Sequence, residues 1–143
     1  IAGKDITDYH IDALARFVGP GQVLIQLGDE IDPDDPWSVS GRETLEILRQ
    51  STDARGQKLE IIRLPDPVDI RSAEPDFVAS YVNYYVCNGA VIAAQFGDTA
   101  ADGRAGEMLQ SLYPGRTIEM IEIDAIGESG GGIHCATQQQ PKI

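Results

Sequence analysis

One order of predicted elements occurs twice in the chain, and this internal repeat limits the folds that the chain can adopt. Strand, turn, strand, Gly-Asp, helix and strand follow one another between residues 12 and 64, and the same order returns between residues 79 and 123. The two Gly-Asp pairs are Gly28-Asp29 and Gly97-Asp98. Each ββαβ unit can bury its apolar faces only against neighbouring units. The repeat therefore predicts a mixed α/β (α+β) fold of adjoining units, in which two units alone leave sheet edges unpaired.

Apolar runs mark the strands of this repeat. They cover residues 12–18, 23–27 and 58–64 in the first unit, and residues 79–86, 90–95 and 117–123 in the second. Turn residues, Gly19-Pro20-Gly21 and Asn88-Gly89, join the first two runs of each unit and favour hairpins. Each unit is therefore expected to begin with a hairpin, and its third strand follows a helix.

One helix is expected between the second and third strands of each unit. Ser40 and Glu43 have the spacing of a capping box, so the first helix is predicted to open at Ser40 and to run to about residue 50. The second is predicted over residues 101–112, where two glycines weaken it. The acidic segment 28–36 is predicted to be a solvated loop, because its prolines and the lack of a suitably spaced glutamate argue against a calcium site.

Composition bounds the classes of function. The 143 residues suffice for one domain, and the hydrophobic fraction of 42% indicates a folded protein. The net charge of −12 argues against partners such as nucleic acid or an anionic membrane surface, and it would suit a cationic substrate. No apolar run approaches the ~20 residues of a membrane span. The chain starts at Ile1 without a signal-peptide pattern, which suggests a fragment, a cleaved chain or a trimmed one.

The two cysteines have different surroundings. Cys87 lies in an apolar run and is expected to be a small buried hydrophobe. Cys135 closely follows three glycines, Gly130, Gly131 and Gly132, which allow a backbone to approach another group closely and can present the thiol to a substrate. The cysteines and histidines do not have the spacing of a zinc site, so no metal is expected.

A nucleophilic cysteine needs a base, and His10 and His134 are the two histidines. If residues 7–12 are extended, His10 and Asp12 share one face, because side chains alternate along a strand. The same rule puts His134 and Cys135 on opposite faces. His10 is therefore the better candidate for the base, and its distance from Cys135 in the sequence is no obstacle.

These motifs resemble a known family. T-D-x-H-x-D at residues 7–12, A-R-F-x-x-P-G at 15–21 and G-G-G-I-H-C-x-T-Q-Q-Q-P at 130–141 are similar to those of the agmatine deiminases, which belong to the guanidine-modifying pentein superfamily and are peptidyl-arginine deiminase-like. The resemblance covers nearly the whole chain, but only the C-terminal portion of the family's length. It implies a propeller of five ββαβ units around a central active site, of which about two complete units are present here.

The resemblance also implies a chemistry. Agmatine would be hydrolysed to N-carbamoylputrescine and ammonia, a step of putrescine (polyamine) biosynthesis, without a cofactor and in the cytoplasm. Cys135 aligns with the nucleophile that attacks the guanidinium carbon and forms a covalent intermediate. His10 aligns with the proton shuttle. Asp12 aligns with a carboxylate that hydrogen-bonds the guanidinium nitrogens in two-pronged geometry.

Part of the family's site has no match in this chain. The family also uses a further substrate-binding aspartate and a glutamate that supports the histidine, both from the earlier part of its sequence. We therefore expect the 143 residues alone to be inactive or weakly active. An N-terminal portion of the same enzyme, or another copy of the chain, would be the partner that completes the site.

Three other interpretations remain. A peptidyl-arginine deiminase-like enzyme would use the same chemistry on a different substrate tail. A papain-like protease is disfavoured, because the usual helix-borne cysteine motif is absent. A non-catalytic fragment that binds a partner chain through its exposed sheet edges would do no chemistry, and the size and reactivity of the pure chain would distinguish it.

Overall fold

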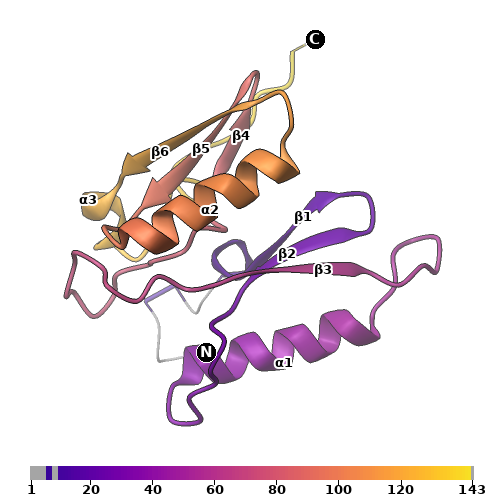
Figure 1. The fold of residues 1–143 in the computed structure, drawn as a ribbon, viewed down its shortest axis with the longest axis horizontal. Helices are drawn as coiled ribbons and strands as arrows, with labels where there is room; N and C mark the ends of the chain where they lie inside the picture. Colours follow the sequence, from indigo (N-terminus) through magenta and orange to yellow (C-terminus); the bar gives the residue numbers. More distant parts are fainter. Residues whose placement is uncertain (1–5, 8–9, 143) are drawn as a thin grey trace.

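The computed structural model describes residues 6–7 and 10–142, which form two three-stranded sheets, each accompanied by one long helix (Figure 1). Asp8 and Tyr9 of the T-D-x-H-x-D motif lie outside the described residues. The first unit consists of the 3₁₀ helix η1 (Ile11–Ala13), β1 (Ala15–Gly19), β2 (Gln22–Gln26), α1 (Pro36–Gln50) and β3 (Glu60–Leu64). The second consists of β4 (Tyr85–Cys87), β5 (Ala90–Gln95), α2 (Thr99–Leu112) and β6 (Thr117–Glu122), followed by the short helix α3 (Asp124–Gly127).

Both sheets have the same strand order and pairing. β1 is antiparallel to β2, and β2 is parallel to β3. The strands β4, β5 and β6 repeat this arrangement. Parallel neighbours need a crossover connection, which α1 and α2 supply. None of the helices in the described part of the chain is long and apolar enough to cross a membrane.

Strand β2 ties the two units together, because both of its faces are buried. Val23 and Ile25 pack with Leu45 of α1 in the smaller core cluster. Leu24, which is fully buried, belongs to the larger cluster and packs there with side chains of the second unit such as Tyr81 and Phe96. A continuous apolar run is typical of a strand covered on both sides. The two units therefore share a core.

The strand expected over residues 12–18 is wrong at its start. Residues Ile11–Ala13 form η1, and β1 begins only at Ala15. The turn closes through hydrogen bonds from the amides of Ala13 and Leu14 to the carbonyl oxygens of His10 and Ile11. Side chains at positions 10 and 12 therefore do not alternate as they would in a strand.

The strand expected over residues 79–86 is also wrong for most of its length, since only Tyr85–Cys87 form β4. The backbone of the preceding residues bonds to side chains and loops instead of a neighbouring strand. The amide of Tyr81 donates to Gln26 Oε1 at 2.6 Å, and Arg16 Nη1 donates to the carbonyl oxygen of Tyr84 at 2.5 Å. These partners belong to the first unit, so this segment joins the units.

The first helix begins earlier than its capping-box pattern predicts. Asp35 is the N-cap, and its carboxylate oxygens accept hydrogen bonds from the amides of Trp37 (3.1 Å) and Ser38 (3.0 Å). Pro36 occupies the first helical position, where its missing N–H costs nothing. Ser40 therefore lies inside α1. The other predicted strands and α2 agree with the structure to within two residues at each end.

Candidate active site

Cys135 lies in a turn that follows α3 and is anchored by a buried side chain. Ile133 is buried in the larger core, whereas Cys135 is exposed and forms no disulfide. The amide of Ala136 donates to the carbonyl oxygen of Gly132 at 3.2 Å, and Thr137 Oγ1 donates to that of Ile133 at 2.8 Å. The sequence thus gives a firmly held turn that exposes its thiol.

Two of the three glycines before this turn have no room for a side chain. Gly130 has a φ of +77°, and a Cβ atom there would lie 2.3 Å from Ile6 Cγ2. A Cβ atom on Gly132 would lie 2.3 Å from Asn83 Oδ1. At Gly131 the nearest atom, Cys135 Cβ, would be 3.5 Å away, which is an ordinary contact. The close approach expected of this glycine run therefore occurs at its first and third positions.

Asp12 reaches the cysteine turn from η1 in the other unit. Its Oδ2 lies 2.6 Å from His134 Nδ1 and 3.5 Å from Cys135 Sγ. Its Oδ1 is buried and has no hydrogen-bond partner among the described residues. Residues from opposite ends of the chain thus form one cluster, which holds a thiol, an imidazole and a carboxylate with one unused acceptor.

The ionised form of Asp12 is favoured in this cluster. Burial by itself, the largest single effect, would raise the pKa of the carboxyl group, whereas the hydrogen bonds from His134 and Cys135 lower it. The charges on His134 and His10 act in the same direction, so the pKa of Asp12 is lowered from its usual 3.8. Asp12 is therefore a carboxylate at neutral pH and can accept hydrogen bonds from a cation.

The predicted histidine arrangement needs one correction. His134 and Cys135 were expected on opposite faces, but they lie in a turn, and both side chains contact Asp12 Oδ2. His10 is exposed at the start of η1, close enough for its charge to act on Asp12. The structure thus brings His134 and Cys135 each into contact with Asp12, and the base role of His10 stays a prediction.

Asn83 is a member of the cluster that the sequence did not reveal. Its side chain is buried, and its amide group contacts Cys135 Sγ at 3.3 Å and the carbonyl oxygen of Asp12 at 3.4 Å. In the strand expected over residues 79–86, Asn83 was an ordinary position with no predicted role. A buried asparagine in an apolar run needs polar partners, and that requirement was the available signal.

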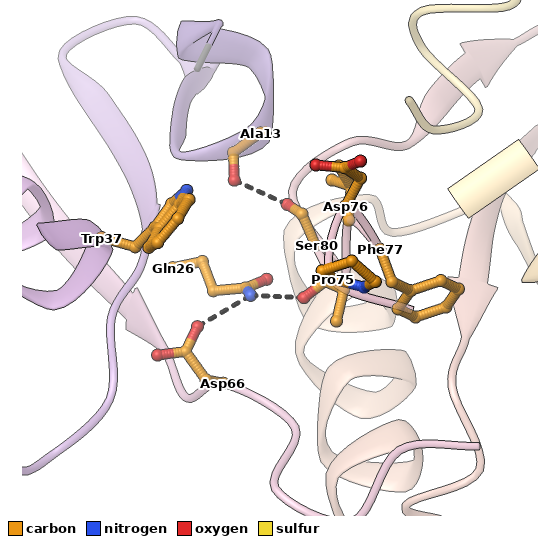
Figure 2. Close-up of a pocket in the computed structure, with 10 residues that line it drawn as sticks. Ala13, Gln26, Trp37, Asp66, Pro75, Asp76, Phe77 and Ser80 are labelled. Carbon is orange, nitrogen blue, oxygen red and sulfur yellow. Dashed lines mark hydrogen bonds between the residues drawn. The ribbon is translucent and has the colours of Figure 1, made fainter. Parts of the chain in front are cut away.

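Hydrogen bonds from Ser80 and Gln26 link the segment before β4 to the first unit (Figure 2). Ser80 Oγ donates to the carbonyl oxygen of Ala13 at 2.7 Å. Gln26 Nε2 donates to the carbonyl oxygen of Ala79 and to the carboxylate oxygen Oδ1 of Asp66, each at 2.8 Å. These residues line a cavity of about 170 Å³ that does not include the cysteine. Ser80 and Gln26 therefore join the segment before β4 to the first unit.

Potential metal ligands do not form a metal-binding group at this cluster in the described part of the chain. Within residues 6–7 and 10–142, no group of three or more His, Cys, Asp or Glu side chains could hold a metal ion. Cys87, which was expected to be buried, is only half-buried, and its thiol donates to the carbonyl oxygen of Ala90 at 3.6 Å. The chemistry available to the described site is that of a thiol beside acid–base groups.

Three comparisons with known proteins agree with one another. The model of the Porphyromonas-type peptidyl-arginine deiminase family matches residues 1–141. A Streptomyces coelicolor protein provisionally named agmatine deiminase is 40% identical over 141 residues, which cover 98% of this chain and 41% of that protein.

Two solved structures have the same fold in this region. A protein of Porphyromonas gingivalis provisionally named arginine deiminase matches with a TM-score of 0.86 at 28% identity, over 97% of this chain and 40% of that one. The agmatine deiminase of Enterococcus faecalis matches with a TM-score of 0.83 at 28% identity, over 95% of this chain and 41% of that one. This chain therefore spans about two fifths of the length of these relatives.

Proposed function

This chain belongs to the Porphyromonas-type peptidyl-arginine deiminase family, and we propose that it is the C-terminal part of an agmatine deiminase, a hydrolase acting on C–N bonds. The observation that carries the proposal is the meeting of Cys135 Sγ with Asp12 Oδ2, 3.5 Å apart, across the junction of the two units. A thiol nucleophile beside a carboxylate is what attack on a bound guanidinium requires.

Cys135 is the nucleophile in this proposal. Its thiolate attacks the central guanidinium carbon of agmatine and forms a C–S bond. One C–N bond then breaks, and its nitrogen leaves as ammonia after it has received a proton. Water next attacks the same carbon, the C–S bond breaks, and the thiolate is released with N-carbamoylputrescine. No electrons are exchanged with a cofactor, since the reaction is a hydrolysis.

His10 carries the protons in both steps. As an imidazolium it protonates the departing nitrogen, and the resulting imidazole then accepts a proton from the attacking water. Its support is the family motif together with its charge effect on Asp12. His134, whose Nδ1 lies 2.6 Å from Asp12, instead holds the carboxylate in place.

Asp12 binds and orients the substrate. Oδ2 is already engaged by His134 and Cys135, whereas Oδ1 has no partner among the described residues. A buried acceptor without a donor is destabilising, and a guanidinium N–H can fill this position. The low pKa of Asp12 keeps the acceptor charged, and the net charge of −12 favours a cationic substrate.

The site needs a further portion of protein. This chain spans about 41% of the Streptomyces coelicolor relative, and the carboxylates expected from the family's earlier sequence have no counterpart here. We infer that the two ββαβ units join further units of a five-bladed propeller, which supply those carboxylates. Another copy of the chain is the alternative partner.

A peptidyl-arginine substrate is the second candidate, and the description of the matching family favours it. The chemistry at Cys135 would be unchanged, because it involves only the guanidinium group. The two candidates differ in the substrate tail, so free agmatine and an arginine-containing peptide should be compared as substrates in the same assay.

Trapping the covalent intermediate tests the proposal. The chain would be joined to the earlier portion of the Streptomyces coelicolor relative, giving a completed protein, and turnover of agmatine would be quenched with acid. Mass spectrometry should find the substrate-derived adduct, formed with loss of ammonia, on the peptide that contains Cys135. His10→Asn should slow turnover by about 10²–10⁴-fold, and His134→Asn should slow it less.

Cys135→Ala in the completed protein is the control and should give neither adduct nor product. An adduct on Cys87, or product formation without any adduct on Cys135, would contradict the assignment of the nucleophile. Equal losses in His10→Asn and His134→Asn would contradict the division of their roles.

A further inference from the structure

Asn83 contacts the cysteine sulfur from a position that solvent does not reach. Its side chain is 1% exposed. Its Nδ2 lies 3.3 Å from Cys135 Sγ and 3.4 Å from the carbonyl oxygen of Asp12. Its Oδ1 accepts a hydrogen bond of 2.8 Å from the amide of His134. One buried side chain therefore connects η1 of the first unit with the turn that carries the thiol.

The orientation of the Asn83 amide follows from these partners. The main-chain N–H of His134 can only donate, so the oxygen of the side chain must face it. The NH₂ group then faces the sulfur and the carbonyl oxygen of Asp12, which are both acceptors. The reverse orientation would set two donors against each other at His134 and two acceptors against each other at Asp12.

The close approach depends on Gly132. A Cβ atom at this position would lie 2.3 Å from Asn83 Oδ1 and 2.7 Å from its Cγ. A side chain there would displace the buried asparagine, because at such short distances one of the two groups must shift. The glycine that precedes the turn and the asparagine that contacts the sulfur are thus spatially matched.

A donor aimed at the sulfur has opposite effects on its two protonation states. An N–H donates more strongly to a thiolate than to a neutral thiol, so Asn83 favours the thiolate. Asp12 acts the other way, because its carboxylate accepts a hydrogen bond from the S–H and repels a thiolate. The other titratable groups near the sulfur are His134, which contacts Asp12, and His10, whose charge acts on Asp12.

We propose that Asn83 stabilises the thiolate of Cys135 through its Nδ2–H group while its Oδ1 fixes the turn that presents the sulfur. The proposal rests on the proposed function, because it names a residue that prepares the nucleophile of that reaction. It concerns the thiol alone, however, and so can be tested without substrate turnover.

The test is the pH dependence of alkylation. Cys87→Ala leaves Cys135 as the single thiol, and iodoacetamide reacts with its thiolate, displacing iodide to form a thioether. In this background the midpoint of rate against pH should move up by about one to two pH units in Asn83→Ala, since one hydrogen bond to a charged sulfur is lost. Asn83→Leu, which fills the space without a donor, should give the same shift and shows that it does not come from a cavity.

Ser80→Ala is the matched control. Ser80 is also buried in the segment before β4 and also bonds to the region of η1, through the carbonyl oxygen of Ala13, but its hydroxyl group bonds to Ala13 and Val82 and not to Cys135. It should therefore leave the midpoint unchanged. An unchanged midpoint in folded Asn83→Ala or Asn83→Leu would overturn the proposal. Loss of cooperative thermal unfolding in both variants would overturn it too, since Asn83 would then be a structural residue only.

Because alkylation needs no substrate, its outcome is separate from that of the proposed function. A shifted midpoint without hydrolysis of agmatine would support the role of Asn83 and contradict the substrate assignment. Hydrolysis of agmatine with an unshifted midpoint would support the substrate assignment and overturn the role of Asn83.

Discussion

At Gly132 the lack of a side chain allows the turn that carries Cys135 to pack closely against Asn83. A Cβ atom at this position would lie 2.3 Å from Oδ1 of the buried Asn83 amide, which contacts both the sulfur and the carbonyl oxygen of Asp12. Gly131, its neighbour, has space for a methyl group. The two positions therefore differ in what they tolerate, although the sequence shows them as equal members of one run.

Gly132→Ala should destabilise the protein by about 1–3 kcal/mol, because the added methyl group forces Asn83 out of its place. It should also slow alkylation of Cys135. Gly131→Ala is the matched control and should change the free energy of unfolding by much less. Chemical denaturation of both variants measures the difference, and equal stability of the two would contradict the packing that we describe.

The identity of the site residues was only partly readable from the sequence. Cys135 stood out because glycines precede it, and Asp12 because it lies near His10 in a motif. The alternation of side chains along a strand does not predict the contact of His134 with Asp12, because these residues form turns. Asn83 was missed for a related reason, since its partners come from distant parts of the chain and only the fold brings them together.

At the scale of elements, the start of α1 shows how local capping patterns compete. Ser40 and Glu43 have the spacing of a capping box, but Asp35 followed by Pro36 begins the helix earlier. Both oxygens of the Asp35 carboxylate accept main-chain hydrogen bonds. Pro36 fits the first helical position, because an N–H there would have no partner within the helix. The added turn brings Trp37 to the cavity between the units.

Asp35→Ala should lower the free energy of unfolding by about 1 kcal/mol, since two amides at the start of α1 lose their acceptor. Ser40→Ala, the matched control, lies within the helix and should be nearly neutral, because alanine is a good helix former. Thermal unfolding of the two variants provides the comparison. A larger loss for Ser40→Ala than for Asp35→Ala would mean that the helix starts at Ser40.

The strands were predictable where their hydrogen bonds are made within one unit. The apolar run of β5 and the Asn88-Gly89 turn gave correct bounds, because the hairpin β4–β5 is a local structure. The segment before β4 was not predictable in this way. Its apolar residues pack in the core shared by the units, and its backbone bonds to side chains of the first unit such as Gln26 and Arg16.

In the whole molecule, the cluster of Asp12, Asn83, His134 and Cys135 lies at the junction of the two units. η1 of the first unit supplies Asp12, the segment before β4 supplies Asn83, and the turn after α3 supplies His134 and Cys135. The shared core around Leu24 fixes the relative position of these segments. The repeat in the sequence pointed to adjoining units, but the distances between the segments depend on long-range packing that no local pattern encodes.

Ammonia release from agmatine is the decisive assay for the proposed reaction and for the incomplete site. It compares the 143-residue chain alone, the same chain joined to the earlier portion of the Streptomyces coelicolor relative, and that portion alone. We expect turnover by the joined protein, loss of that turnover in Cys135→Ala, and little or none from either part. Turnover that survives Cys135→Ala would contradict the assignment of the nucleophile. A joined protein that folds but releases no ammonia would contradict the proposed reaction. Full activity of the isolated chain would contradict the claim that its site is incomplete.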